Sequence, residues 1–172
     1  MRTVVIAEAG VNHNGSIDLA KKMIDASKDC GADYIKFQTF KADQIVTKKT
    51  EMTDYQKKNT SDKKTQYDML KELELDIDDH FDLLDYCKKA RIGFLSSGFD
   101  IESIDFLNEL DLDFFKIPSG EITNLPYLIH IAKKEKPIVL STGMSNLNEI
   151  SEAIEILFKN GVRKDNLTIL HC

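Results

Sequence analysis

Two lysines stand inside apolar runs of this 172-residue sequence, where a charged side chain is unusual. Lys36 lies in YIKFQT (34–39) and Lys116 lies in FFKIPSGE (114–121). Burying an unpaired ammonium group costs free energy on the order of several kcal/mol, so each lysine needs an anionic or polar partner. Lysine acts as a point charge for phosphate and carboxylate groups. Together the two lysines predict a site for an anion that carries more than one charge.

Hydroxyl groups near the ends of similar apolar runs could complete such a site. They belong to Ser97, Ser119 and Ser141. Exposed backbone N–H groups in the turns that follow could add to it. The alternative for either lysine alone is that its stem is buried while its ammonium group reaches solvent at a strand end.

Two glutamates, Glu8 and Glu121, occur in the same strand-end positions. Each could orient a sugar hydroxyl or move a proton. Ion pairing with Lys36 or Lys116 is the alternative, and the residue types alone leave both roles open. His13, in VNHNGS, is interpreted as a turn or capping residue, and no two histidines have the spacing of metal ligands.

Short apolar segments alternate with amphipathic segments along the chain, which predicts a parallel sheet with right-handed crossovers. The expected strands are 3–10, 32–40, 91–99, 112–120, 136–143 and 166–172, and the expected helices are 16–31, 77–90, 101–110, 125–134 and 147–161. Polar residues end nearly every strand, which favours a barrel over an open sheet whose site concentrates at one switch point. The first βα turn, AGVNHNGS, also lacks GxGxxG spacing. We predict an α/β fold, a TIM-type (β/α)8 barrel truncated after about six strands.

The expected domain organisation follows from this strand count. A closed barrel of this kind takes about 250 residues, so residues 1–172 are predicted to be a partial barrel domain of a longer protein. Segment 41–70 is long and polar, and it is interpreted as a lid-like insertion or, alternatively, as a solvated one.

The composition excludes several classes of protein. The chain is 42% hydrophobic and 30% charged with a net charge of −6, and no run approaches the ~18–20 apolar residues of a membrane span. No stripe of basic and aromatic residues predicts a nucleic-acid interface. Three cysteines without a CxxC pair indicate reduced thiols and no zinc site. We expect a cytoplasmic protein with neither nucleic acid nor membrane as a partner.

Four motifs together, IAEAGVNHNGS, YIKFQT, FFKIPSGE and KPIVLSTGM, resemble the sialic acid synthase family, and the resemblance runs from Val4 to Cys172. It implies a transferase of carbohydrate biosynthesis that condenses phosphoenolpyruvate with N-acetylmannosamine or a related amino-hexose, forming a nonulosonic acid and releasing phosphate. It also implies further barrel strands, an antifreeze-like domain and a homodimer in the full-length protein. Legionaminic or pseudaminic acid synthase is an alternative with the same chemistry, and a non-catalytic phosphate-binding barrel fragment is another.

The resemblance also implies roles for individual residues. Lys36, Lys116, Ser119 and Ser141 match groups that hold the phosphate and carboxylate of phosphoenolpyruvate, with Lys116 also stabilising charge during catalysis. Of the two carboxylates, Glu8 matches one near the sugar aldehyde.

The remaining positions are a second carboxylate, an asparagine and a serine, and the last two follow the family less closely. Glu121 matches a carboxylate that manages a proton on the attacking water or the enolic carbon, and Asn59 resembles a sugar-contacting asparagine. Ser97 stands where some relatives have threonine in STPF, but here the run is SSGF. The family's divalent metal, manganese or magnesium, is held by histidines that would lie beyond Cys172. We therefore predict no metal ligand within these residues and no activity for them in isolation.

Overall fold

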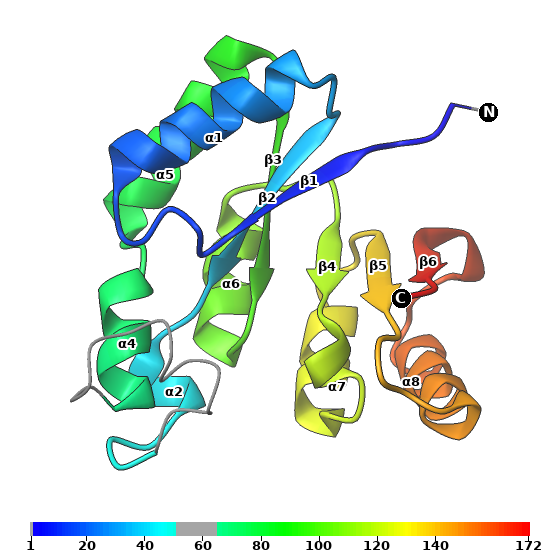
Figure 1. The fold of residues 1–172 in the computed structure, drawn as a ribbon. Helices are drawn as coiled ribbons and strands as arrows, with labels where there is room; N and C mark the ends of the chain where they lie inside the picture. Colours follow the sequence, from blue (N-terminus) through cyan, green and yellow to red (C-terminus); the bar gives the residue numbers. More distant parts are fainter. Residues whose placement is uncertain (1, 51–64) are drawn as a thin grey trace. The chain divides into compact units, whose positions relative to one another are not determined.

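The computed structural model describes residues 2–50 and 65–172, and the chain divides into two compact units, Met1–Phe94 and Leu95–Cys172 (Figure 1). In each unit short strands alternate with helices, as the apolar periodicity predicted. No helix in the described part of the chain is both long and apolar enough to cross a membrane.

The first unit is built on strands that pair in parallel. Strands β1 (Ile6–Gly10) and β2 (Tyr34–Thr39) are in a register that puts Glu8 opposite Lys36. Strand β3 (Gly93–Gly98) belongs to the same sheet, of order β1-β2-β3, and its residues run on into the second unit.

Helices cover this sheet with their apolar faces. Helices α1 (Ile17–Asp29) and α5 (Ile77–Ala90) lie side by side (Figure 1). The largest fully buried side chains of this unit come from both helices and from β2, and they are Ile24, Ile35, Phe37 and Leu83. Burial of each such side chain contributes roughly 1.5–3 kcal/mol, which is why the strand and helix faces with these residues point inward.

A close contact between β2 and the start of β3 requires a residue without a side chain. A Cβ atom at Gly93 would lie 2.2 Å from Cδ1 of Tyr34, inside its ring's van der Waals surface. The Gly93 N–H donates to the carbonyl of Asp33 at 2.8 Å. The Tyr34 ring therefore lies over the Gly93 backbone.

The second unit contains three parallel strands in the order β4-β5-β6. They are β4 (Phe115–Ile117), β5 (Ile138–Ser141) and β6 (Leu167–Leu170). The register places Lys116 opposite Val139. The helices of this unit are α6 (Ile101–Glu109), α7 (Leu125–Ala132) and α8 (Leu147–Lys159), with 3-10 turns η1 (Ser119–Glu121) and η2 (Lys164–Asn166). Helices α7 and α8 pack against each other (Figure 1).

Helix ends follow the signals predicted in the sequence. The Ser16 hydroxyl caps α1 by accepting the N–H of Leu19, and Asn146 forms a capping box with Glu149 at the start of α8. Each such cap stabilises a helix by about 1 kcal/mol. Gly31 and Gly161 follow the ends of α1 and α8 with positive φ, the conformation that glycine adopts most readily.

Segment 41–70, predicted as one insertion, contains helix at both ends. Helix α2 (Ala42–Ile45) begins just after β2, and helix α4 (Gln66–Leu73) covers the end of the segment. Both are short and largely polar, so they lack the apolar periodicity that marks longer helices. Residues 51–64 lie outside the described part of the chain.

Candidate functional site

The buried lysine of the first unit is paired with a carboxylate. Lys36 is 9% exposed, and its Nζ lies 2.5 Å from Oε2 of Glu8, whose side chain is about half exposed. This is the ion pair that the sequence left open as the alternative role of Glu8. An ammonium group has three N–H donors, and the Glu8 contact occupies one direction only. Lys36 can therefore hold Glu8 and also contact a second anion.

Polar groups gather around the end of β1. A Cβ atom at Gly10 would lie 3.3 Å from Oε1 of Glu8 and 3.5 Å from Nε2 of Gln38. Gln38 is two residues after Lys36, so both side chains lie on the same face of β2. Gln38 was not among the predicted site residues, although its two-residue spacing from Lys36 was a signal for it.

His13 is completely buried in the turn after β1. Its Nδ1 accepts the N–H of Gly15 at 3.1 Å, and its ring centroid lies 6.1 Å from that of Phe37. This geometry gives His13 the turn role that the sequence indicated. Burial lowers the pKa of the His13 imidazole, which favours the neutral ring. Because Nδ1 accepts a hydrogen bond, the proton of the neutral ring is on Nε2. Nε2 has no hydrogen-bond partner among the described residues.

A second buried histidine links α5 to the end of β2. The Nδ1–H of His80 donates to the carbonyl of Asp76 at 2.6 Å, and Nε2 accepts from the Thr39 hydroxyl at 2.7 Å. Because a carbonyl oxygen only accepts, these contacts require the tautomer protonated on Nδ1. Burial lowers the pKa of His80. The neutral ring thus holds the strand that carries Lys36.

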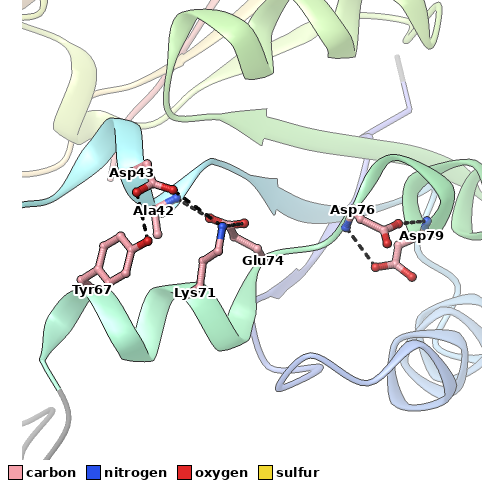
Figure 2. A network of polar contacts seen from close by, with 7 residues as sticks. All are labelled: Ala42, Asp43, Tyr67, Lys71, Glu74, Asp76 and Asp79. Carbon is pink, nitrogen blue, oxygen red and sulfur yellow. Dashed lines mark hydrogen bonds and ion pairs between the residues drawn. The ribbon is translucent and has the colours of Figure 1, made fainter. Parts of the chain in front are cut away.

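Figure 2 shows a polar network that holds α2, directly after β2, against α4. The Ala42 N–H donates to Oε1 of Glu74 at 2.5 Å, while Lys71 Nζ lies 2.8 Å from the other oxygen of Glu74. The Tyr67 hydroxyl donates to Asp43 at 3.0 Å. Glu74 thus accepts one of the N–H groups left unbonded at the start of α2. The network anchors the chain where it leaves the strand of Lys36.

The buried lysine of the second unit lies in a different setting. Lys116 is 7% exposed, and its Nζ donates to the carbonyl of Ile117 at 2.7 Å. The turn η1 follows directly and carries Ser119 and Glu121. Oε2 of Glu121 accepts from Nδ2 of Asn124 at 2.7 Å, and Asn124 in turn caps α7. The start of α7 therefore orients the Glu121 carboxylate.

Three chain segments meet at the carboxyl ends of β4, β5 and β6. A Cβ atom at Gly143 would lie 3.2 Å from Oγ of Ser119 and 3.7 Å from Cβ of Cys172. The Thr142 hydroxyl donates to the carbonyl of Leu170 at 2.8 Å, which ties the end of β5 to the end of β6. The sheet therefore brings together residues that are distant in the sequence.

This strand-end cluster stabilises negative charge. A hydrogen bond from the Ser141 hydroxyl lowers the pKa of the Cys172 thiol, and the backbone N–H groups of Thr142 and Gly143 and the charge of Lys116 act in the same direction. The predicted residues Lys116 and Ser141 thus favour the thiolate form of Cys172, and the predicted Ser119 lies next to Gly143 in the same cluster. The role of Cys172 was not predictable from the sequence, because its neighbours come from β4 and β5.

Two further predicted residues stand apart from these contacts. Ser97 in β3 is 1% exposed, and its hydroxyl has no hydrogen-bond partner among the described residues. Asn59 lies outside the described part of the chain.

Within residues 2–50 and 65–172 no three His, Cys, Asp or Glu side chains lie close enough to hold a metal ion. The divalent metal therefore stays an expectation from the resemblance. An apolar pocket of about 460 Å³ does lie beside α6 and α7, but none of the predicted site residues lines it. The strand ends, which carry the charged groups, are the better candidate.

The model of the NeuB family matches residues 23–172. The chain belongs to the NeuB family. The sialic acid synthase resemblance is thereby confirmed. The N,N′-diacetyllegionaminic acid synthase of Campylobacter jejuni is 55% identical over 171 residues, which are 99% of this chain and 51% of the relative. The enzyme of the same name from Legionella pneumophila is 50% identical over 174 residues, covering 100% and 49%.

A solved structure supports the fold of this NeuB family member. The N-acetylneuraminic acid synthetase of Leptospira borgpetersenii, crystallised with citrate, matches with a TM-score of 0.82 at 28% identity, over 100% of this chain and 54% of that one. The predicted TIM-type barrel class is confirmed, and the described residues supply six of its strands. The chain spans about half the length of the curated relatives it matches.

Proposed function

We propose that the protein condenses phosphoenolpyruvate with an N-acetylated amino-hexose, giving a sialic-acid-type nonulosonic acid and phosphate. The observation that carries this proposal is the cluster at the carboxyl ends of β4 and β5 in a NeuB family chain. There the Ser119 hydroxyl and Cys172 both lie close to Gly143, and the Ser141 hydroxyl and the charge of the buried Lys116 lower the pKa of the Cys172 thiol. Phosphoenolpyruvate has two anionic groups, a phosphate and a carboxylate, and a buried lysine beside hydroxyl groups suits either of them.

Lys116, Ser119 and Ser141 bind one end of phosphoenolpyruvate in this proposal. In the first unit, Lys36 can also bind an anionic group of the substrate, since its ammonium keeps donors beyond the one facing Glu8. The buried hydroxyl of Ser97 suits a carboxylate oxygen of the donor, because a buried hydroxyl without a partner is costly unless a ligand completes it.

The two glutamates handle the acceptor and the proton. Glu8 is half exposed beside Lys36, which leaves its carboxylate accessible to a sugar. In this proposal the Glu8 carboxylate accepts a hydrogen bond from the sugar and orients its aldehyde end. Glu121, oriented by Asn124, moves the proton of the water that adds to the carbon bearing the phosphate. Phosphate then leaves by C–O cleavage, and Lys116 stabilises its charge. Because the described residues offer no metal site, we assign no step to the expected metal.

The relatives favour one acceptor over another. Both enzymes reported above at 50% identity or more are named for N,N′-diacetyllegionaminic acid, whereas the sialic acid synthetase is 28% identical. We therefore propose a deoxy-diacetamido hexose as the acceptor, with N-acetylmannosamine as the second candidate.

The proposed assembly of the full-length protein is a homodimer, which light scattering of the purified protein would test.

The experiment is an assay of the full-length protein with phosphoenolpyruvate, a divalent metal and each hexosamine in turn. We expect phosphate release and a nonulosonic acid product by mass spectrometry, fastest with the deoxy-diacetamido hexose. Binding of phosphoenolpyruvate without phosphate release with any acceptor would favour the non-catalytic alternative. Absence of both binding and turnover would contradict the proposed function.

A further inference from the structure

Gly143 lies at the centre of the strand-end cluster, but its backbone does not require glycine. Four other glycines of the described chain have positive φ, where a side chain causes strain, and Gly143 is not among them. The missing side chain at position 143 therefore has a different cause, which lies in its neighbours.

Ser119 and Cys172 are the residues nearest to a Cβ atom built at Gly143. The 3.2 Å between the Cβ position and Ser119 Oγ is shorter than an ordinary van der Waals contact, which begins at about 3.5 Å. Cβ of Cys172 lies 3.7 Å away and limits movement in that direction. The backbone itself is held, because the neighbouring Thr142 hydroxyl donates to the carbonyl of Leu170. A methyl group at position 143 would therefore push the Ser119 hydroxyl away by a few tenths of an ångström.

We propose that Gly143 is a positioning residue: its lack of a side chain lets the Ser119 hydroxyl occupy the place from which it binds phosphoenolpyruvate. This inference rests on the proposed function. Gly143 acts through Ser119 and needs no contact of its own with the substrate. Misplacing the Ser119 hydroxyl would remove one hydrogen bond to the charged substrate, and losing such a bond weakens binding roughly ten- to hundred-fold.

The test uses Gly143→Ala in the full-length protein. We expect the KM for phosphoenolpyruvate to rise roughly ten-fold or more with kcat nearly unchanged, the pattern of a lost uniform binding contact. Gly120→Ala is the matched control: a Cβ at Gly120, next to Ser119, meets no atom within 4 Å, and its φ is not positive. Its KM should equal that of the wild type.

A double-mutant cycle with Ser119→Ala separates positioning from a general packing defect. Removing the hydroxyl removes the close contact, so Gly143→Ala added to Ser119→Ala should cause no further rise in KM. Two effects that simply multiply, or an unchanged KM for Gly143→Ala alone, would overturn the inference.

Urea unfolding tests the contact between residue 143 and the Ser119 hydroxyl in the absence of substrate. Gly143→Ala should lower the urea midpoint, and Ser119→Ala in the same chain should restore it. If Gly143→Ala fails to fold, the double variant should fold; failure of both would contradict the inference. If the wild type does not bind phosphoenolpyruvate at all, the proposed function fails, while the unfolding cycle still decides whether Gly143 positions Ser119.

Discussion

The Lys36 ammonium group lies 2.5 Å from Oε2 of Glu8, the residue directly opposite it on the neighbouring parallel strand. Lys116 is equally buried, but its strand register places the apolar Val139 opposite it. Lys36 thus faces a carboxylate on the neighbouring strand, whereas Lys116 donates to the carbonyl of Ile117 and lies near the hydroxyl and backbone N–H groups that lower the pKa of Cys172. The two lysines should therefore respond differently to mutation.

Glu8→Gln should lower the free energy of unfolding by about 1–3 kcal/mol, because it leaves the buried Lys36 without its charged partner. Urea denaturation of the full-length protein would measure the change. Glu155→Gln is the control, since the Glu155–Lys159 pair on α8 is well exposed on both sides and should contribute less than about 0.5 kcal/mol. Equal effects of the two variants would contradict the structural role of the Glu8 pair.

Lys116→Met should abolish or strongly weaken binding of phosphoenolpyruvate while the fold is kept, because an apolar chain replaces a buried charge. Losing one charge-assisted contact corresponds to roughly ten- to hundred-fold weaker binding, which calorimetry would detect. Lys159→Met, on the exposed surface of α8, should bind normally. An unfolded Lys116→Met protein whose folded fraction binds with normal affinity would instead make Lys116 structural.

The three free cysteines should differ in reactivity. Cys172 is exposed and its pKa is lowered, first by the Ser141 hydroxyl, whereas burial raises the pKa of Cys87 to about 12. Because the thiolate is the nucleophile, iodoacetamide should label Cys172 first and Cys87 last, as peptide mass spectrometry would show. Phosphoenolpyruvate should slow labelling of Cys172 but not of the exposed Cys30. Equal labelling rates at Cys30 and Cys172 would be inconsistent with the charge-stabilising cluster.

Stability should fall at acidic pH because of buried histidine. Burial lowers the pKa of His80, so below its ordinary value of about 6.5 the unfolded state takes up the proton more readily than the folded state. The contribution of the neutral ring is complete above that pH and is lost as the pH falls through the folded pKa. Urea unfolding from pH 7.5 to 5 should show a weaker pH dependence for His80→Gln, with a remaining slope from His13. Identical slopes would refute this.

Helix positions were predictable because their ends carry local signals. Ser16 and Asn146 cap α1 and α8 through contacts within three residues, so the sequence alone reveals them. Strands were predicted too long: apolar residues 112–120 suggested one strand, but β4 ends at Ile117 because Pro118 has no N–H to donate and leads into η1.

The candidate site was only partly predictable for a different reason. A lysine within an apolar run predicted a buried charge at Lys36 and at Lys116. The group that each lysine contacts, however, depends on the register of the strands. Cys172 acquires its environment from β4 and β5, which are more than 25 residues away along the chain, roughly the length of a βα unit. No local pattern encodes such a contact.

The ring of Tyr34 over Gly93 has an evolutionary consequence. Any side chain at position 93 would overlap that ring, so residue 93 cannot become larger unless residue 34 loses its ring. In an alignment of NeuB sequences these two columns should covary, with a larger residue at 93 accompanied by a ringless one at 34. Such covariation would preserve the alignment of β2 with β3, and with it the position of Lys36 along the sheet.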